Sequence, residues 1–447
     1  MNTNMKIALI SLGCPKNQVD ADVMCRSLLA AGHESTGELS EADVIIVNTC
    51  GFIESAKAEA IENILMACSY KEQNPNLKVI VTGCLAERYK EEIRKEMPEV
   101  DAVVGIGSNS TICAVVEHLS AGPLEQYGPK TAMPLGGARV ISTPPHYAYL
   151  KIAEGCNNGC YYCAIPLIRG GLRSRPMADC VAEAKWLADQ GVKELIVVAQ
   201  DPTAYGEDWG KPGSICQLLD QLNTIDGIRW IRVLYAYPER ITDEFVAALK
   251  RNEKVLPYLD LPIQHCNDEI LHGMNRRGGR KEIEDAIAKL RAAIPDIALR
   301  TTLIAGFPGE TEEQFEEMCQ FVRDMQFDRL GCFAYSPEEG TKAATMPNQI
   351  DEEVKQRRAD QIMEIQTGIM SRKQAARVGQ ELECICDELD EENGLYLLRT
   401  MSDAPEIDGN VCVPADGRPL EFGHFYKIRI LDSDLYDLYG EVVEEIV

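Results

Sequence analysis

Runs of aliphatic and β-branched residues alternate with segments of helical spacing in the first part of the chain. Such continuous apolar runs, separated by helices, are typical of parallel strands that are buried on both faces. The predicted strands are Lys6–Ser11, Asp43–Asn48, Lys78–Thr82 and Asp101–Val104. The predicted helices are Asn17–Ala31, Ile53–Ser69 and Leu85–Glu96. The pattern therefore predicts an open parallel α/β sheet.

A second alternating array follows a stretch rich in glycine and proline, which predicts a linker at residues 122–145. The strand candidates are Ala148–Ala153, Glu194–Ala199, Trp230–Tyr235, Tyr258–Leu261, Leu299–Ile304 and Arg329–Ala334. The intervening helices are expected near Met177–Gln190, Ser214–Leu222, Thr242–Asn252, Lys281–Ala293 and Thr311–Met325. Six strand–helix units predict a partial (β/α)6 barrel, whose functional site belongs at the C-terminal ends of its strands.

The last part of the chain changes to short strands and turns. A polar helical stretch at Asp351–Arg377 precedes them. The predicted strands are Leu382–Asp387, Leu395–Thr400, Asn410–Val413, Tyr426–Leu431 and Tyr439–Val443. Five short strands predict a small OB-like β-barrel. The chain is thus an α/β protein with domains at 1–121, 146–378 and 379–447, and the linker at 122–145 lies between the first two.

Composition narrows the class of protein. The chain has 447 residues, of which 45% are hydrophobic and 26% are charged, and no apolar run is long enough to span a membrane. Seventeen cysteines in so large a chain fit a reducing compartment better than a disulfide scaffold, so we expect a cytoplasmic location. The net charge of −26 favours a basic partner or a small molecule over nucleic acid, unless a local basic patch is present.

Cys156, Cys160 and Cys163 form a CxxxCxxC motif in the loop after the first predicted barrel strand. One short loop can fold three such thiolates around an iron–sulfur cluster. A four-iron cluster held by three cysteines keeps one iron open, and that iron can chelate an amine and a carboxylate. The alternatives are three buried thiols or a structural zinc site, although zinc usually takes four ligands.

Cys14, Cys50 and Cys84 each follow a predicted strand, at the turn into the next helix. In an open parallel sheet these turns share the carboxyl edge, where ligands bind. Each cysteine has a glycine beside it, which permits close backbone approach. The alternative is coincidence among many cysteines. We predict a second three-cysteine 4Fe–4S cluster here.

Several stretches make the resemblance to a known family specific. They are Ser-Leu-Gly-Cys-Pro-Lys-Asn at Ser11–Asn17, Tyr147–Cys156, Cys163–Pro166, Tyr258–His265, Gly306–Thr311 and Tyr335–Thr341. Over essentially its whole length the chain resembles the methylthiotransferase family of radical S-adenosylmethionine (SAM) enzymes. That family has an N-terminal three-cysteine domain, a radical SAM barrel and a C-terminal TRAM domain. Pro202 departs from the pattern, because the family usually has a hydroxyl residue there.

The resemblance implies the cofactors, the reaction and the partners. It implies SAM and two 4Fe–4S clusters, of which the one on Cys156, Cys160 and Cys163 binds SAM and generates the radical, and the other carries the methylated sulfur. Within the family the match favours the branch that adds a methylthio group to the β-carbon of an aspartate on ribosomal protein S-twelve. An electron donor and a sulfur donor are also implied, both unidentified. A transfer-RNA adenosine methylthiotransferase is the main alternative, and a non-catalytic iron–sulfur RNA-binding or regulatory protein is the alternative of another class.

Other side chains carry weaker signals. His265 follows a barrel strand and either contacts a ligand or is a packed core histidine. The arginines after the CxxxCxxC motif meet SAM, an acidic substrate or a carboxylate of the protein itself; they are Arg169, Arg173 and Arg175. Cys384 and Cys386 are expected on opposite faces of a strand, which disfavours a shared metal.

The predicted C-terminal domain is strongly acidic. Residues 379–447 hold 18 Asp and Glu against 4 Lys and Arg, a net charge of −14. We expect the stretches Asp387–Glu392 and Asp432–Glu445 to attract a basic protein and to disfavour RNA, although ordinary solvated turns would have the same composition.

Overall fold

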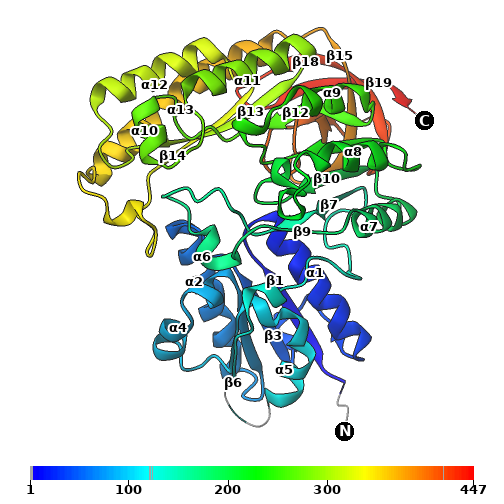
Figure 1. The fold of residues 1–447 in the computed structure, drawn as a ribbon. Coiled ribbons are helices and arrows are strands. Elements are labelled where there is room, and N and C mark those ends of the chain that lie inside the picture. The colour runs from blue at the N-terminus through cyan, green and yellow to red at the C-terminus, as the bar shows by residue number, and fades with distance from the viewer. Residues whose placement is uncertain (1–3, 120–121, 123, 416, 447) are drawn as a thin grey trace. The chain divides into compact units, whose positions relative to one another are not determined.

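The computed structural model describes residues 4–119, 122, 124–415 and 417–446 and folds into two compact units (Figure 1). The first unit combines residues 1–142, 151–175 and 336–344, and the second contains the rest of the chain. Among the described residues, no helix has both the length and the apolar character needed to cross a bilayer.

A six-stranded parallel sheet forms the centre of the first unit, in the order β2-β1-β3-β4-β5-β6. Its strands are β1 (Lys6–Ser11), β2 (Glu34–Ser35), β3 (Val44–Thr49), β4 (Lys78–Gly83), β5 (Ala102–Val104) and β6 (Leu124–Gln126). Its helices are α1 (Pro15–Ala30), α2 (Glu54–Ser69), α3 (Cys84–Arg88), α4 (Lys90–Glu96) and α5 (Ile112–His118). Successive residues of one strand enter different cores: Ile45 and Val47 pack with α2 to α4, and Ile46 packs with α1 and α5. This burial on both faces explains the continuous apolar runs.

The predicted linker is more ordered than its composition indicates. It contains β6, which pairs in parallel with β5, and the short 3₁₀ turn Lys130–Ala132. The boundary that we placed after residue 121 therefore cuts through the first sheet. The remaining domain boundaries stay predictions.

The second unit contains the predicted partial barrel, a six-stranded sheet in the order β14-β13-β12-β11-β10-β7. Its strands are β7 (Tyr147–Lys151), β10 (Glu194–Val198), β11 (Trp230–Val233), β12 (Val255–Asp260), β13 (Ala298–Ala305) and β14 (Arg329–Ala334). The helices around it are α7 (Met177–Asp189), α8 (Ser214–Asn223), α9 (Asp243–Arg251), α10 (Asp268–Gly273), α11 (Arg280–Ala293), α12 (Glu312–Met325) and α13 (Glu352–Ala375). The predicted α/β architecture is confirmed.

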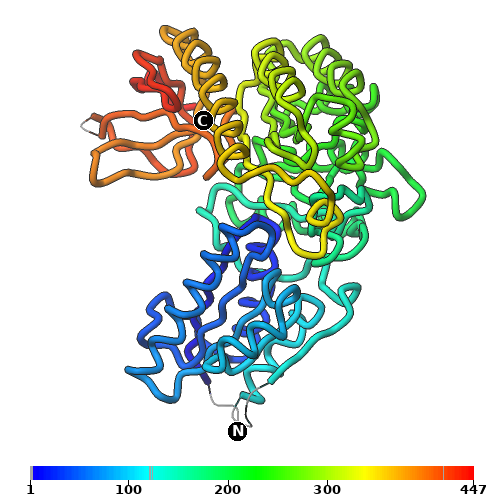
Figure 2. Tube along the Cα trace, turned by 90° about the vertical axis from the view of Figure 1, so that its left-hand side faces the viewer, coloured from blue at the N-terminus to red at the C-terminus, as the bar shows by residue number. Residues whose placement is uncertain are grey.

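Five strands after α13 close into a small barrel in the order β15-β16-β17-β19-β18 (Figure 2). They are β15 (Glu381–Asp390), β16 (Leu395–Thr400), β17 (Val411–Pro414), β18 (Phe425–Ser433) and β19 (Leu438–Ile446). All of the pairs are antiparallel except β17 with β19. Cys384 and Cys386 both lie in the core of this barrel, so the expectation of opposite faces was wrong. Residues two apart in a strand share a face.

A buried ionic network in the second unit links β10 to the C-terminal barrel. Glu194 is fully buried and accepts hydrogen bonds from Arg232 Nε at 2.7 Å and from Arg399 Nη1 at 2.8 Å. Burial alone would raise the pKa of Glu194, but the two guanidinium groups outweigh it and lower that pKa. The carboxylate therefore stays ionised between two cations.

Replacing Glu194 with alanine should lower the free energy of unfolding by about 3–5 kcal/mol, because two guanidinium groups then stay buried without their shared carboxylate. Asp285→Ala is the matched control, since it breaks the exposed pair of Asp285 with Lys281 at 2.6 Å and should cost at most about 1 kcal/mol. Urea unfolding of both variants measures the difference. Equal losses would contradict the network's structural role.

Candidate functional site: two groups of three cysteines

The first three cysteines lie at the carboxyl ends of neighbouring parallel strands. Cys14 precedes α1 after β1, Cys50 directly follows β3, and Cys84 begins α3 after β4. Gly13 has a φ of +90°, and a Cβ atom there would lie 2.9 Å from Cys50 Sγ. Gly83 has a φ of +94°, and a Cβ atom there would lie 2.4 Å from the Thr49 carbonyl oxygen. Glycine at both positions lets the cysteine-bearing turns approach one another, as the sequence predicts.

Cys50 and Cys84 are buried, Cys14 is half-buried, and the nearby charges act differently on the three thiols. Burial alone would raise the pKa of Cys14, but the charges of Lys16 and Arg169, with backbone N–H groups, outweigh it and lower that pKa. Burial raises the pKa of Cys50, and it raises the pKa of Cys84 to about 12 although Arg169 opposes it. Charge on Cys14 or Cys50 would raise the pKa of Cys84 further, which reflects how close the three sulfurs are.

The second three cysteines lie in the loop between β8 (Ala153–Glu154) and α6 (Ile165–Arg169). β8 pairs with β9 (Arg173–Ser174), which closes the ends of this loop. Inside it, Cys156 N donates to Gly170 O at 3.1 Å and Cys163 N donates to Cys160 O at 3.1 Å. Burial raises the pKa of Cys163 to about 12, and the nearby Cys156 and Cys160 add to the effect. The loop therefore places the three thiols near one another.

The donor chemistry fits iron–sulfur clusters better than single ions. Within the described ranges, no three His, Cys, Asp or Glu side chains gather closely enough to hold one metal ion. Structural zinc usually takes four ligands on a single ion, whereas each group offers three cysteines. A cluster distributes its thiolates over different irons, and metal binding deprotonates such thiols. Both groups thus fit three-cysteine clusters, and the six ligand assignments stay a proposal.

Arg169 connects the two groups inside the first unit. It lies on α6, six residues after Cys163, and its side chain is 1% exposed. Its Nη1 donates to Asp20 Oδ2 and to Glu154 Oε2, both at 2.9 Å, and its Nη2 lies 3.4 Å from Cys84 Sγ. The sequence analysis left three partners open for Arg169: SAM, an acidic substrate or a carboxylate of the protein itself. The structure shows it with carboxylates of the chain itself.

Lys151 completes this buried network, which the sequence analysis missed. Its ammonium group bonds to Asp20 and lies 3.2 Å from Glu154 Oε2. Burial alone would raise the pKa of Glu154, but Arg169 and Lys151 outweigh it and lower that pKa to about 2. The sequence gave one signal for this network, the acidic residue Glu154 directly before Gly155 and Cys156. Nothing in the sequence indicated that Asp20 on α1 would be its neighbour.

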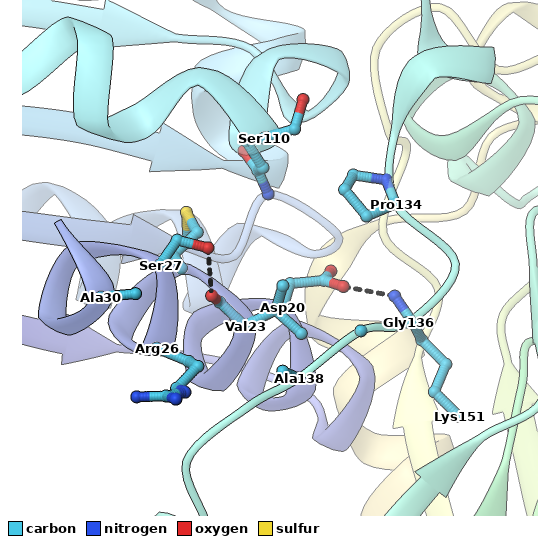
Figure 3. A pocket seen from close by; sticks show the side chains of 13 residues that line it. Asp20, Val23, Arg26, Ser27, Ala30, Ser110, Pro134, Gly136, Ala138 and Lys151 are labelled. Atoms are coloured by element: carbon cyan, nitrogen blue, oxygen red, sulfur yellow. Dashed lines mark hydrogen bonds and ion pairs between the residues drawn. The ribbon is translucent and has the colours of Figure 1, made fainter. Parts of the chain in front are cut away.

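A cavity of about 400 Å³ opens beside this network, between α1 and residues 134–138. Figure 3 shows the Asp20 carboxylate directed toward the Lys151 ammonium group at its edge. Arg26 and Ser27 also line it, on the same helix. The ion pair of Asp20 and Lys151 therefore lines the cavity, and the same Asp20 carboxylate accepts a hydrogen bond from Arg169.

The other arginine candidates also bind within the protein. Arg173 Nη1 donates to the carbonyl oxygens of Thr131 at 2.9 Å and of Met133 at 3.1 Å. Arg175 Nη1 donates to Lys151 O at 3.3 Å. Both side chains therefore brace the segment that flanks the second cysteine loop.

His265 is a packed core residue in the second unit. It is fully buried, and its Nδ1 accepts a hydrogen bond from Asn267 N at 3.0 Å. Its Nε2 lies 3.3 Å from Glu310 Oε2, and the same carboxylate accepts from Gly306 N at 3.0 Å. The Glu310 carboxylate therefore holds the glycine-rich turn after β13, and His265 is packed beside it, in agreement with the packed alternative.

Three family models match successive parts of the chain. The model described as "Uncharacterized protein family UPF0004" matches residues 6–105, the Radical SAM superfamily matches residues 150–322, and the TRAM domain matches residues 378–443. The first covers strands β1 to β5 with Cys14, Cys50 and Cys84, and the second covers the CxxxCxxC loop. The predicted order of these domain types is confirmed.

Solved structures with a similar fold are radical SAM enzymes. The methyltransferase TsrM from Kitasatospora setae, with cobalamin and a [4Fe-4S] cluster bound, superimposes with a TM-score of 0.57 at 13% identity, covering 76% of this chain and 74% of that one. The cobalamin-dependent enzyme OxsB, with aqua-cobalamin and S-adenosylmethionine bound, gives a TM-score of 0.51 at 10% identity, covering 81% and 56%. At these identities the likeness concerns the fold alone.

Curated relatives match along almost the entire chain. A protein of Acetivibrio thermocellus named "Ribosomal protein uS12 methylthiotransferase RimO" is 47% identical over 449 residues, covering 98% of this chain and 99% of the relative. A protein of the same name from Clostridioides difficile is 47% identical over 447 residues, covering 99% of this chain and all of the relative. With the three domain types and both cysteine groups in place, this chain belongs to the RimO family of radical SAM methylthiotransferases.

Proposed function

We propose that this chain adds a methylthio group to the β-carbon of an aspartate on ribosomal protein uS12 of the small subunit. The observation that carries the proposal is the full-length identity to proteins named for that activity. The two groups of three cysteines within one compact unit support it, because the reaction needs both a radical source and a sulfur carrier. A reducing cytoplasm suits it as well, since all seventeen cysteines are free.

The six cysteines named above hold two 4Fe–4S clusters in this proposal. When bound, SAM and the clusters supply the radical and the sulfur, which no side chain of the protein can supply. The residues of the chain position these groups. Arg169, Glu154 and Lys151 fix the CxxxCxxC loop through buried ion pairs, and the strand ends fix the other three thiols. Cys50 and Cys84 are buried and the other four cysteines are half-buried, which limits the access of water to reactive species.

The charge of the C-terminal barrel supports a basic protein partner. Each of its four basic residues already has a carboxylate partner: Arg399 pairs with Glu194, Arg418 with Glu445, Lys427 with Glu444, and Arg429 with Glu381. Few positive charges are then left to face the phosphates of RNA. Asp387 does not contribute to the predicted acidic surface, because its carboxylate is largely buried against His146 and Arg399.

Reversing three exposed charges of this barrel should slow binding to uS12. The variant Glu391→Lys/Glu392→Lys/Asp432→Lys should associate roughly tenfold more slowly at low salt and equally fast at high salt, because long-range attraction is screened by ions. SAM cleavage should not change. Stopped-flow binding to uS12 at several salt concentrations measures the effect.

The matched control reverses three exposed charges of the first unit: Glu59→Lys/Glu62→Lys/Glu92→Lys. It has the same net charge as the test variant, so a smaller effect shows that the position of the charges matters. Equal slowing by both variants would show that only the total charge of the protein matters, and not the acidic surface of the barrel. Tight binding of unmodified transfer RNA would favour the alternative substrate.

A further inference from the structure

We propose that Arg169 is a positioning residue that raises the reduction potential of the cluster on Cys14, Cys50 and Cys84. The inference rests on the proposed function, because it assumes a cluster at those cysteines. Arg169 belongs to the segment that follows the other cysteine motif, yet its Nη2 lies 3.4 Å from Cys84 Sγ. A guanidinium so close to a ligand sulfur acts directly on the charge of the cluster. Hydrogen bonds to cluster sulfurs and local charge are what set such potentials.

The other contacts of the guanidinium fix its orientation. Nη1 donates to Asp20 and Glu154, and Nη2 also donates to Asn17 Oδ1 at 3.2 Å. Asn17 is itself held, since its Nδ2 donates to Leu12 O at 2.7 Å. Because Nη1 and Nη2 both donate to acceptors on α1 and β8, the guanidinium is held in the plane that reaches Cys84.

The local charge balance makes the effect on the sulfur strong. The two cations of the network, Arg169 and Lys151, face two carboxylates, Asp20 and Glu154, so the network is neutral on its own. A thiolate at Cys84 adds a negative charge on the arginine side. All four ionic groups are at most 5% exposed, so little water screens the interaction. Arg169 thus stabilises extra negative charge on the cluster, which is the condition of the reduced state.

Apolar packing ties the same segment to Cys84. Ala164, directly before α6, and Ile168, within it, share a small core with Cys84, Ile106 and Met133. The loop that carries the SAM-binding cysteines is therefore anchored on the turn that carries Cys84. Arg169 is the charged member of this anchor.

The test uses the full-length variant Cys156→Ala/Cys160→Ala/Cys163→Ala, which should hold only the N-terminal cluster. In this background, a redox titration followed by electron paramagnetic resonance gives the midpoint potential. Arg169→Gln should lower the equilibrium constant for one-electron reduction about tenfold, a shift of about 59 mV to lower potential. Arg169→Lys retains the charge but cannot reach all four partners, so it should shift the potential in the same direction by less.

Arg173→Gln is the matched control, because Arg173 lies on the same segment and donates to backbone carbonyls. The Arg173→Gln variant should leave the midpoint potential unchanged. If the effect of Arg169→Gln came only from a general loosening of the segment, Arg173→Gln would shift the potential equally. If the Arg169→Gln variant loses its iron, the midpoint potential of the Arg169→Lys variant tests the inference. Unchanged potentials in the iron-containing Arg169 variants would overturn the inference and leave the proposed function intact. A background variant that binds no iron would overturn both.

Discussion

The variant Cys14→Ala/Cys50→Ala/Cys84→Ala should retain reductive cleavage of SAM and lose methylthio transfer completely. These thiols lie at the strand ends of the first sheet, whereas the CxxxCxxC loop has three thiols of its own. Chromatography of 5′-deoxyadenosine and mass spectrometry of the product measure the two steps separately. Iron content should fall from about eight to about four per chain, since each cubane cluster holds four.

The control for this variant removes three other cysteines of the same sheet domain, Cys25, Cys68 and Cys113. They lie within α1, α2 and α5 and not at strand ends, so their replacement with alanine should spare both steps. Normal methylthio transfer by the first variant would mean that Cys14, Cys50 and Cys84 only stabilise the fold.

Replacing Cys156, Cys160 and Cys163 with alanine should abolish SAM cleavage and, with it, every later step. The loop between β8 and α6 brings these three thiols together, and the radical depends on the cluster that they hold. About half of the iron should remain, on the other group. Anaerobic reconstitution, iron analysis and 5′-deoxyadenosine production check the result.

Cys180→Ala/Cys216→Ala is the comparison for that variant, since both residues are buried inside helices α7 and α8. It should keep its iron and its SAM cleavage. Production of 5′-deoxyadenosine by the CxxxCxxC variant would show that the SAM-binding cluster lies elsewhere.

Much of the fold could be predicted because local pattern and final burial agree. Ile45, Ile46 and Val47 are all apolar because the sheet is covered on both sides. β6 was missed because three residues, Leu124–Gln126, carry no period of their own and become a strand only by pairing with β5. Short edge strands depend on a neighbour, which a local pattern does not reveal.

The residues of the candidate site also fall into those that local sequence predicts and those that only tertiary contacts reveal. The cysteines could be predicted from motif spacing and from their positions after strands, which are local properties. The contact of Arg169 with Asp20 could not, because it joins residues 149 positions apart. From the sequence, Asp387 is likewise predicted to belong to an acidic surface. In the structure it bonds to Arg399 and His146 instead. Tertiary packing decides which charges are buried.

The most direct test of the proposed reaction is a mass spectrum of uS12 after anaerobic incubation of small ribosomal subunits with the reconstituted protein, SAM, a sulfide source and a reductant. We expect one methylthio group in place of one hydrogen, and fragmentation should place it on the side chain of a single aspartate. The Cys14→Ala/Cys50→Ala/Cys84→Ala variant should leave uS12 unmodified under the same conditions. Unmodified uS12 together with methylthio-adenosine in added transfer RNA would contradict the account.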